Sequence, residues 1–379
     1  MSDRPTPVGA LLRAVPPDRL PEVVADHLRR HHSAARVEVL LGDLTLDGLW
    51  PVLEPHGPTG NQLAQRCFGS QRPVVDIAAD TNRAYLPISV WGARLGVLVV
   101  ETTQPSGDGL TDRLSAVADE LAVALRAADD TTDRYRRVTR RERLTMAAEL
   151  QWELLPGRSL GDERFLVAGQ LEPAYAVYGD HFDWSLTGDR LTITVLNGCG
   201  DGIEAAVLTT VSVNAMRNAR RSGANIVEQA ELASDAVYAR YGGAMHVATL
   251  LLEVDLVGGR VEAVDAGSPR AVIARDREIR TITLEQQLPL GMFGETRYET
   301  QRFLLEPGDR MLVVSDGVHM ASPAGRSPYG ETALLTALRR TRLQPATEAV
   351  GTVMRDLREY HAGVDATDDA VTVCLDWRR

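Results

Sequence analysis

The chain has 379 residues, of which 44% are hydrophobic, and it carries a formal net charge of −11. This length predicts two domains, and the negative charge argues against nucleic acid as a partner, because a phosphate backbone requires a basic surface. The three cysteines, Cys67, Cys199 and Cys374, are too widely spaced for a zinc motif or a disulfide framework, so we expect a cytoplasmic protein. No apolar run is long enough for a signal peptide or a membrane span, and we expect neither.

Residues 1–128 are expected to form an α+β domain of the kind that senses signals. Leu20 and Leu28 lie on one face of an amphipathic helix predicted over residues 18–33. After this helix the patterns predict two strands around a turn at Gly42-Asp43, a short helix, a third strand, a hairpin and an alanine- and leucine-rich helix. These elements cover residues 35–53, 58–71, 72–77, 84–102 and 109–128.

Three segments of this domain resemble the GAF class of sensor domains, which is related to the PAS class. They are Arg72-Pro73-Val74, Tyr85-Leu86-Pro87-Ile88 and Arg94-Leu95-Gly96-Val97-Leu98. A generic α+β domain without a ligand is the alternative interpretation. Cys67 could bind haem or a metal, but beside Phe68 it is more typical of a buried packing residue.

Residues 129–156 are expected to form a linker helix that ends at Pro156. An apolar stripe at helical spacing comprises Leu144, Ala147, Ala148, Gln151, Leu154 and Leu155. Such a stripe favours a two-stranded coiled coil, and we therefore expect a homodimer. A plain solvated helix is the alternative.

Residues 157–379 alternate strands with helices. The strands expected from β-branched content cover residues 191–198, 247–256, 259–267, 270–274, 309–317 and 370–378. The expected helices cover residues 331–341 and 345–361. This pattern predicts a sandwich of two sheets with helices outside both.

Acidic residues and glycines recur where these strands end. They occur in Tyr178-Gly179-Asp180-His181-Phe182-Asp183, Asn197-Gly198-Cys199-Gly200-Asp201-Gly202, Ser315-Asp316-Gly317-Val318 and Asp368-Asp369-Ala370-Val371. Carboxylate and carbonyl oxygens are the ligands that Mg²⁺ and Mn²⁺ prefer, and glycine lets a backbone carbonyl approach an ion. The pattern therefore predicts a site for hard divalent cations.

The C-terminal half resembles the metal-dependent PPM-type protein phosphatases, in particular the SpoIIE/RsbU branch. Besides the acidic segments, the matching points follow the family order from an entry helix to the last strand. They are Ala148-Glu149-Leu150-Gln151, Leu154-Leu155-Pro156, Glu172-Pro173-Ala174, Ala205-Ala206, Asp265-Ala266-Gly267-Ser268-Pro269, Pro289-Leu290-Gly291 and Pro307-Gly308-Asp309. The expected fold is therefore α+β throughout: a GAF-like sensor domain (1–128), a linker helix (129–156) and an α-β-β-α sandwich of the PPM type (157–379).

The resemblance implies a set of metal ligands and a reaction. Asp180, Asp316 and Asp368 are the expected side-chain ligands, and the Gly198 carbonyl is a further one. Two ions, Mn²⁺ or Mg²⁺, would activate a water for attack on phosphorus. The implied substrate is a phosphoserine or phosphothreonine on a STAS-type anti-anti-sigma protein.

Asn197 departs from the family pattern at a catalytic position. The family has an aspartate there that bridges both metals, whereas asparagine is neutral and offers one carbonyl oxygen. Tyr178, Ser268 and Met320 also depart, from a glycine, a histidine and a commonly acidic residue respectively.

Two functions follow from these observations. The first is a protein serine/threonine phosphatase in which other side chains compensate for Asn197; the candidates are Asp183, His181, Asp201 and Glu204. The second is a pseudophosphatase that binds a partner without turnover. We favour the enzyme, with Asp180, Asn197, Asp316 and Asp368 as its catalytic positions. We also expect His181 to be an exposed turn residue.

Overall fold

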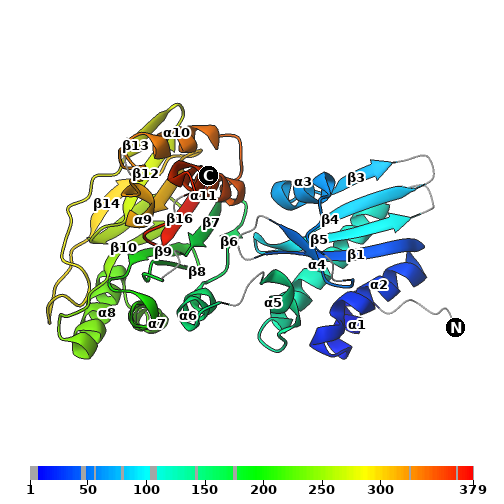
Figure 1. Cartoon of the computed structure of the whole chain (residues 1–379), viewed down its shortest axis with the longest axis horizontal. Helices are drawn as coiled ribbons and strands as arrows, with labels where there is room; N and C mark the ends of the chain where they lie inside the picture. Colours follow the sequence, from blue (N-terminus) through cyan, green and yellow to red (C-terminus); the bar gives the residue numbers. More distant parts are fainter. Residues whose placement is uncertain are drawn as a thin grey trace. The chain divides into compact units, whose positions relative to one another are not determined.

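The computed structural model describes residues 7–43, 48–54, 57–77, 81–102, 109–140, 144–173, 177–323, 326–363 and 366–378. The chain divides into two compact units, residues 1–143 and residues 144–379 (Figure 1). Within the described ranges, no helix combines the length and the apolar composition needed to cross a membrane.

Unit 1 is an antiparallel five-stranded sheet with helices on both faces. Its strands, in the sheet order β2-β1-β5-β4-β3, are Leu49–Pro51, Ala34–Gly42, Ala93–Thr102, Asn82–Val90 and Val74–Ile77. Its helices are α1 (Val8–Ala14), a 3₁₀ turn (Pro17–Arg19), α2 (Leu20–His31), α3 (Gln62–Ser70), α4 (Leu110–Ala128) and α5 (Arg134–Thr139).

The alternation of side chains along the strands of unit 1 builds two cores. Val37 and Val39 of β1 pack with α1, α2 and α4, whereas Leu40 packs on the opposite face with α3 (Figure 1). Cys67 is fully buried in this second core beside Phe68. Its burial raises the pKa of the thiol to about 12, which keeps it protonated and fits a packing role.

Unit 2 is a sandwich of two antiparallel sheets. One sheet has the order β14-β11-β10-β9-β8, with bounds Gln301–Leu304, Arg260–Ala266, Ala248–Asp255, Arg190–Asn197 and His181–Thr187. The other has the order β13-β12-β15-β16-β7-β6, with bounds Glu278–Thr281, Arg270–Arg275, Arg310–Val314, Ala370–Trp377, Phe165–Glu172 and Ser159–Gly161. The side chains between the sheets form one apolar core.

Helices cover both outer faces of this sandwich. The helices α7 (Gly202–Arg221) and α8 (Ile226–Tyr241) pack on the first sheet. The helices α10 (Ala333–Arg340) and α11 (Ala346–His361) pack on the second sheet, where the short helix α9 (Asp316–His319) follows β15. The α-β-β-α architecture expected from the sequence is therefore present in unit 2.

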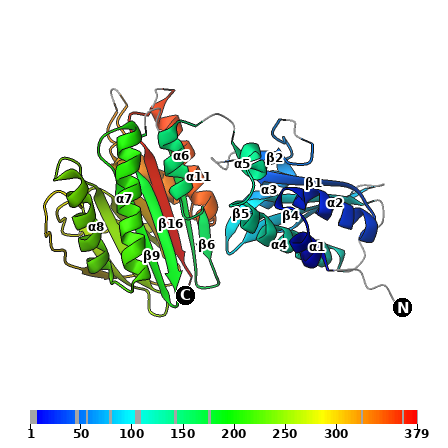
Figure 2. The same ribbon diagram turned by 90° about the horizontal axis from the view of Figure 1, so that it is seen from below.

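The segment expected to be one linker helix is interrupted. The chain is extended at Arg140 and Thr145, which separates α5 from α6 (Met146–Leu154). The Thr145 hydroxyl caps α6 by accepting a hydrogen bond from the Ala148 N–H, so a new helix begins there. Helix α6 belongs to unit 2, where it lies beside α7 (Figure 2).

The apolar stripe of α6 is buried inside unit 2. Ala147 and Ala148 pack against Val177 and Ala206, and Leu154 joins the core beneath α7. A stripe that is covered by its own unit cannot form a coiled coil with a second chain in this arrangement. The stripe therefore does not support the predicted homodimer.

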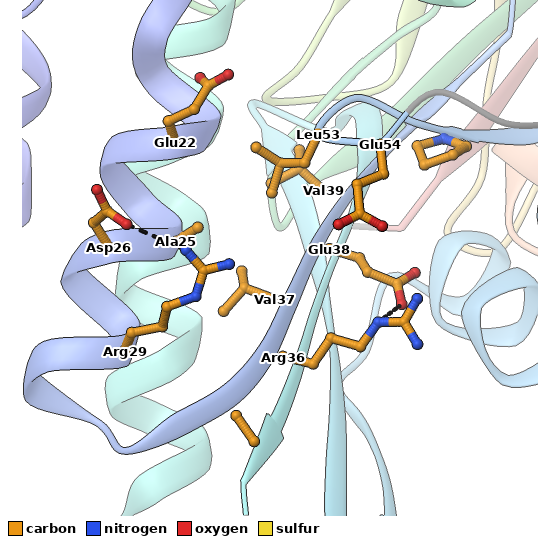
Figure 3. Close-up of a pocket in the computed structure, with 12 residues that line it drawn as sticks. Glu22, Ala25, Asp26, Arg29, Arg36, Val37, Glu38, Val39, Leu53 and Glu54 are labelled. Carbon is orange, nitrogen blue, oxygen red and sulfur yellow. Dashed lines mark hydrogen bonds and ion pairs between the residues drawn. The ribbon is translucent and has the colours of Figure 1, made fainter.

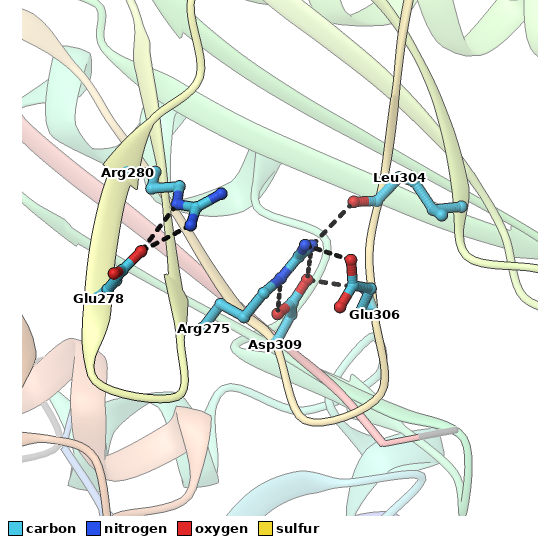
Figure 4. A network of polar contacts seen from close by, with 6 residues as sticks. All are labelled: Arg275, Glu278, Arg280, Leu304, Glu306 and Asp309. Atoms are coloured by element: carbon cyan, nitrogen blue, oxygen red, sulfur yellow. Dashed lines mark hydrogen bonds and ion pairs between the residues drawn. The ribbon is translucent and has the colours of Figure 1, made fainter.

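An arginine network joins the two sheets away from the acidic segments. Arg275 of β12 makes two bonds to the Asp309 carboxylate, of 2.9 and 2.7 Å, and donates to the Leu304 carbonyl at the end of β14 (Figure 4). It also pairs with Glu306. A planar guanidinium suits this geometry because it offers parallel donors to one carboxylate. The network fixes the turn between β14 and β15.

Candidate functional site

The acidic segments lie at the ends of four strands of unit 2, two neighbouring strands in each sheet. Asp180 precedes β8 and Asn197 ends β9, and these two strands are neighbours in the first sheet. Asp316 follows β15 and Asp368 precedes β16, which are neighbours in the second sheet. Hydrogen bonds between the two pairs of loops bring them to one edge of the sandwich.

Asp369 is the residue that joins the loops. Its Oδ2 accepts hydrogen bonds from the N–H groups of Tyr178 and Gly179, at 2.8 and 2.9 Å. The Gln151 side chain of α6 donates to the same oxygen at 2.9 Å and to the Asp180 carbonyl at 2.7 Å. The second carboxylate of the Asp-Asp pair thus holds the backbone that carries Asp180.

Two glycines permit this close approach. A Cβ at Gly317 would collide with the Asp369 carbonyl oxygen, so only glycine allows the loops at 316 and 368 to meet. A Cβ at Gly198 would lie 2.7 Å from the Tyr178 carbonyl oxygen. The glycines in the acidic segments therefore have a packing role.

The three expected ligand carboxylates influence one another strongly. Burial, followed by the charges of Asp316 and Asp368, raises the pKa of Asp180 well above its usual value. Burial and the charge of Asp316 raise the pKa of Asp368 to about 7. Carboxylates that repel one another in a buried site are a favourable environment for a cation.

A divalent cation fits the donor chemistry of this edge but not its present side-chain positions. Asp180 is 1% exposed and its Oδ2 has no hydrogen-bond partner, which is the state of an oxygen that lacks a ligand. However, no three His, Cys, Asp or Glu side chains in the described ranges are grouped closely enough to hold a metal ion. Asp316 instead accepts a hydrogen bond from Ser268 Oγ at 3.3 Å. Cation binding would require side chains here to rotate.

Asn197, the last residue of β9, is buried beside this site. It is 3% exposed, and neither its Oδ1 nor its Nδ2 has a hydrogen-bond partner. A buried amide without partners costs about 1–3 kcal/mol relative to a satisfied one. The position therefore suits a ligand oxygen, although the side chain present is neutral.

Four side chains were candidates to replace the missing charge of Asn197. Asp183 is paired with Arg217 at 2.8 Å and with Arg220 at 3.1 Å, so its charge is already neutralised. His181 is fully buried at the start of β8, and burial lowers its pKa to about 4, so it is a neutral core residue. The expectation of an exposed turn histidine is wrong. Asp201 and Glu204 are both exposed at the start of α7.

Gln151 and Asp369 are functional positions whose contacts the sequence did not predict. Gln151 is 1% exposed. Its signal in the sequence was a polar residue at a buried position of an apolar stripe, which requires a buried polar partner. The signal for Asp369 was weaker, because either aspartate of an Asp-Asp pair could have been the ligand.

Unit 2 is similar in sequence to a known protein family. Residues 187–378 match the family model described as stage II sporulation protein E (SpoIIE). Protein IcfG of Synechocystis is 21% identical over 261 residues, a match that covers 61% of this chain and 41% of IcfG. This chain therefore spans less than half the length of that curated relative.

Two solved structures share the fold of unit 2. The SiaA-PP2C domain of Pseudomonas aeruginosa has a TM-score of 0.52 and 18% identity, over 61% of this chain and 94% of that one. The RsbU and RsbW domains of a Mycobacterium tuberculosis protein have a TM-score of 0.50 and 22% identity, over 59% of this chain and 63% of that one. At these identities the comparisons establish a common fold.

Proposed function

This chain belongs to the SpoIIE family, and we propose that unit 2 is a metal-dependent protein serine/threonine phosphatase. The observation that carries the proposal is the edge where burial and the charges of Asp316 and Asp368 raise the pKa of Asp180, and burial and the charge of Asp316 raise the pKa of Asp368. Among the described residues, no arginine forms an ion pair with these three carboxylates. The fold shared with the SiaA-PP2C domain supports it.

The proposed ligands are Asp180, Asp316, Asp368 and the Gly198 carbonyl, for Mn²⁺ or Mg²⁺. Ions held there would supply Lewis-acid activation of water and would neutralise charge on a phosphoryl group. The chain itself positions the donors. Gln151 and Asp369 fix the backbone of Tyr178–Asp180, whereas Asp316 would exchange its hydrogen bond from Ser268 Oγ for the ion.

The proposed substrate is a phosphorylated STAS-type anti-anti-sigma protein, and the proposed location is the cytoplasm. The relative with RsbU and RsbW domains supports a role of this kind in regulation. We also propose that unit 1 is a GAF-like sensor domain and that the protein is a homodimer, because domains of this sensor class often serve as dimerisation modules. Since the α6 stripe is buried, the dimer would use another surface. Light scattering that gives the mass of a single chain at micromolar concentration would contradict the dimer.

The experiment that tests the enzyme proposal is phosphate release from a phosphorylated STAS-domain protein in Mn²⁺ and in EDTA. Full-length protein is expected to release phosphate only with Mn²⁺. Asp316→Asn is expected to lower this rate by about 1,000-fold, because it removes an anionic ligand. Release that is equal in EDTA, or unchanged in Asp316→Asn, would contradict the proposed site.

The second candidate function is a pseudophosphatase that binds its partner without turnover. Asn197 favours it, because a neutral amide occupies the position of the expected bridging carboxylate. A silent wild type with an active Asn197→Asp variant would establish this alternative. If wild type turns over and Asn197→Asp adds less than about tenfold, the enzyme proposal stands, because the missing charge is then tolerated.

A further inference from the structure

A groove of about 530 Å³ lies in unit 1 between α2 and the outer edge of β1 (Figure 3). Five consecutive strand residues, 35–39, line it. Neighbouring side chains of a strand point to opposite faces of the sheet. A groove that contacts five in a row therefore meets the strand along its edge.

This edge of β1 is open. The outermost strand, β2, pairs with β1 only at Leu40, Leu41 and Gly42, and the Val52 N–H donates to the Val39 carbonyl at 2.9 Å. Backbone groups alternate in direction along a strand, so Val37 presents its N–H and carbonyl to the same side as Val39. Within the described residues no strand pairs with residues 35–38 on that side. The groove thus ends on unpaired backbone donors and acceptors.

The groove has an apolar floor and an acidic rim. The floor consists of Ala25, Val37, Val39, Pro51 and Leu53. The rim carries four carboxylates and two guanidiniums, from Glu22, Asp26, Glu38, Glu54, Arg29 and Arg36. Because Arg134 also pairs with Glu22, the carboxylates around the groove outnumber the guanidiniums by one, and this excess favours an occupant with positive charge.

Both rim arginines are held in local ion pairs. Arg29 pairs with Asp26 at 3.2 Å, and Arg36 pairs with Glu38 at 2.9 Å (Figure 3). More than half of each arginine side chain is exposed, and exposed pairs of this kind contribute little. A cationic side chain can therefore compete for the carboxylates.

We propose that this groove binds an extended, basic peptide segment of a partner protein, which pairs with β1 as an additional strand. Backbone hydrogen bonds to Val37 would supply affinity, and alternate side chains would distinguish sequences. Apolar side chains of the peptide would contact the floor, and lysine or arginine side chains would face the rim.

The groove wall is connected to the last helix of unit 1. Glu22 forms two bonds with Arg134 of α5, of 2.9 and 2.6 Å. The hydroxyl of the next residue, Tyr135, donates to the Pro17 carbonyl at 2.5 Å. Because α5 directly precedes the segment that enters unit 2, an occupant beside Glu22 contacts the wall that anchors this helix.

The test is a titration of full-length protein with a fluorescent octapeptide that alternates lysine and valine, followed by anisotropy. Two control peptides have the same length: one alternates glutamate and valine, and the other is the lysine peptide methylated on alternate backbone nitrogens. We expect saturable binding of the lysine peptide, weakened by about tenfold or more in each control. Methylation removes the donors of a paired strand without changing charge. Equal binding of the methylated peptide, or no saturable binding, would overturn the proposal.

Two variants locate the binding site. Glu54→Lys reverses a rim charge and should weaken binding by about tenfold. Asp76→Lys makes the same charge change at an exposed position of β3, outside the groove, and should leave binding unchanged. The lysine peptide should also slow deuterium exchange within residues 34–39. Equal loss in both variants, or competition by spermidine with no change in exchange, would show a non-specific or small-cation site and overturn the proposal. Because the readout is binding, its failure leaves the phosphatase proposal untouched.

Discussion

Buried aspartates of unit 2 occur in two electrostatic environments. Asp183 and Asp309 are each 2% exposed and are neutralised by arginine, the first by Arg217 and Arg220 and the second by Arg275. These pairs join α7 to β8 and the turn before β15 to β12. Removal of either partner of such a pair leaves an uncompensated buried charge, which is strongly destabilising.

At the acidic edge Asp180 is equally buried and Asp316 and Asp368 are half-buried, but their charges are not compensated by arginine. Asp180 is 1% exposed, yet its charge interactions are with Asp316 and Asp368, which raise its pKa. Within the described residues no arginine or lysine forms an ion pair with these three. A fold that pairs Asp183 and Asp309 with arginine but leaves these three carboxylates without an ion pair has placed excess negative charge where a cation can bind.

The largest effect on stability is expected when a paired aspartate is removed. Asp183→Ala leaves Arg217 and Arg220 largely buried without their anion, and it should lower the free energy of unfolding by about 3 kcal/mol. Urea denaturation measures this change. Asp189→Ala, which removes an exposed partner of Arg164, is the control and should have little effect. Equal losses of unfolding free energy in the two variants would show that the buried ion pairs of Asp183 contribute no more than an exposed one.

The arginine network of Figure 4 provides a second test of the paired environment. Asp309→Ala removes both bonds from Arg275 and the acceptor for the Glu306 N–H, at 2.7 Å. It should lower the free energy of unfolding by about 2 kcal/mol, because Arg275 is partly exposed and can regain water. The control is Glu278→Ala, which removes a separate pair with Arg280 whose two side chains are each 68% exposed, and no measurable change is expected.

Gln151→Met tests how the entry helix positions the acidic edge. It removes the donor to Asp369 and to the Asp180 carbonyl, and it should cost about 1–3 kcal/mol of stability. Mn²⁺ affinity should fall as well, because the loop that carries Asp180 loses a support. A variant that loses stability but keeps full Mn²⁺ affinity would show that Gln151 supports only the packing of α6.

Asp316→Asn is expected to act in the opposite direction from Asp183→Ala. Without metal it removes a negative charge that raises the pKa of both Asp180 and Asp368, so unfolding in EDTA should become harder by about 1 kcal/mol. Thermal unfolding in EDTA measures this change. A destabilised variant would show that Asp316 is a structural residue.

The raised pKa of Asp265 predicts a smaller change in the free energy of unfolding, which depends on pH. Burial raises its pKa to about 6, although the Gly267 N–H donates to it at 3.0 Å. The folded state therefore holds a proton that the unfolded state releases, and stability is lost as pH rises from about 4 to about 6. Asp265→Asn should remove about 1 kcal/mol of this loss, measured by urea denaturation at pH 4.5 and pH 8. An unchanged pH profile would contradict the assignment.

The sequence predicted the sandwich better than its helices. Strand β15 is an apolar run followed by Ser-Asp-Gly, and β11 ends at Ala266 before Gly267; these patterns are readable locally. Helices α7 and α8 were not predicted, although Asn225 and Glu228 form a capping box that marks the start of α8. The small residues of α7 give only a weak apolar periodicity.

The linker prediction failed because an amphipathic pattern does not specify which surface covers its apolar face. The stripe through Ala147, Gln151 and Leu154 suits a second chain as well as it suits α7. Only tertiary structure shows that Gln151 contacts Asp369. Likewise, the neutralisation of Asp183 by two arginines of α7 depends on residues more than thirty positions away.

The most direct test of the cation site is calorimetric titration of Mn²⁺ into wild-type protein, Asn197→Asp and Asp316→Asn. Our account predicts measurable binding by wild type, tighter binding by about tenfold or more in Asn197→Asp because of its added charge, and none in Asp316→Asn. Equal Mn²⁺ affinity in all three proteins, or no binding even in Asn197→Asp, would contradict it.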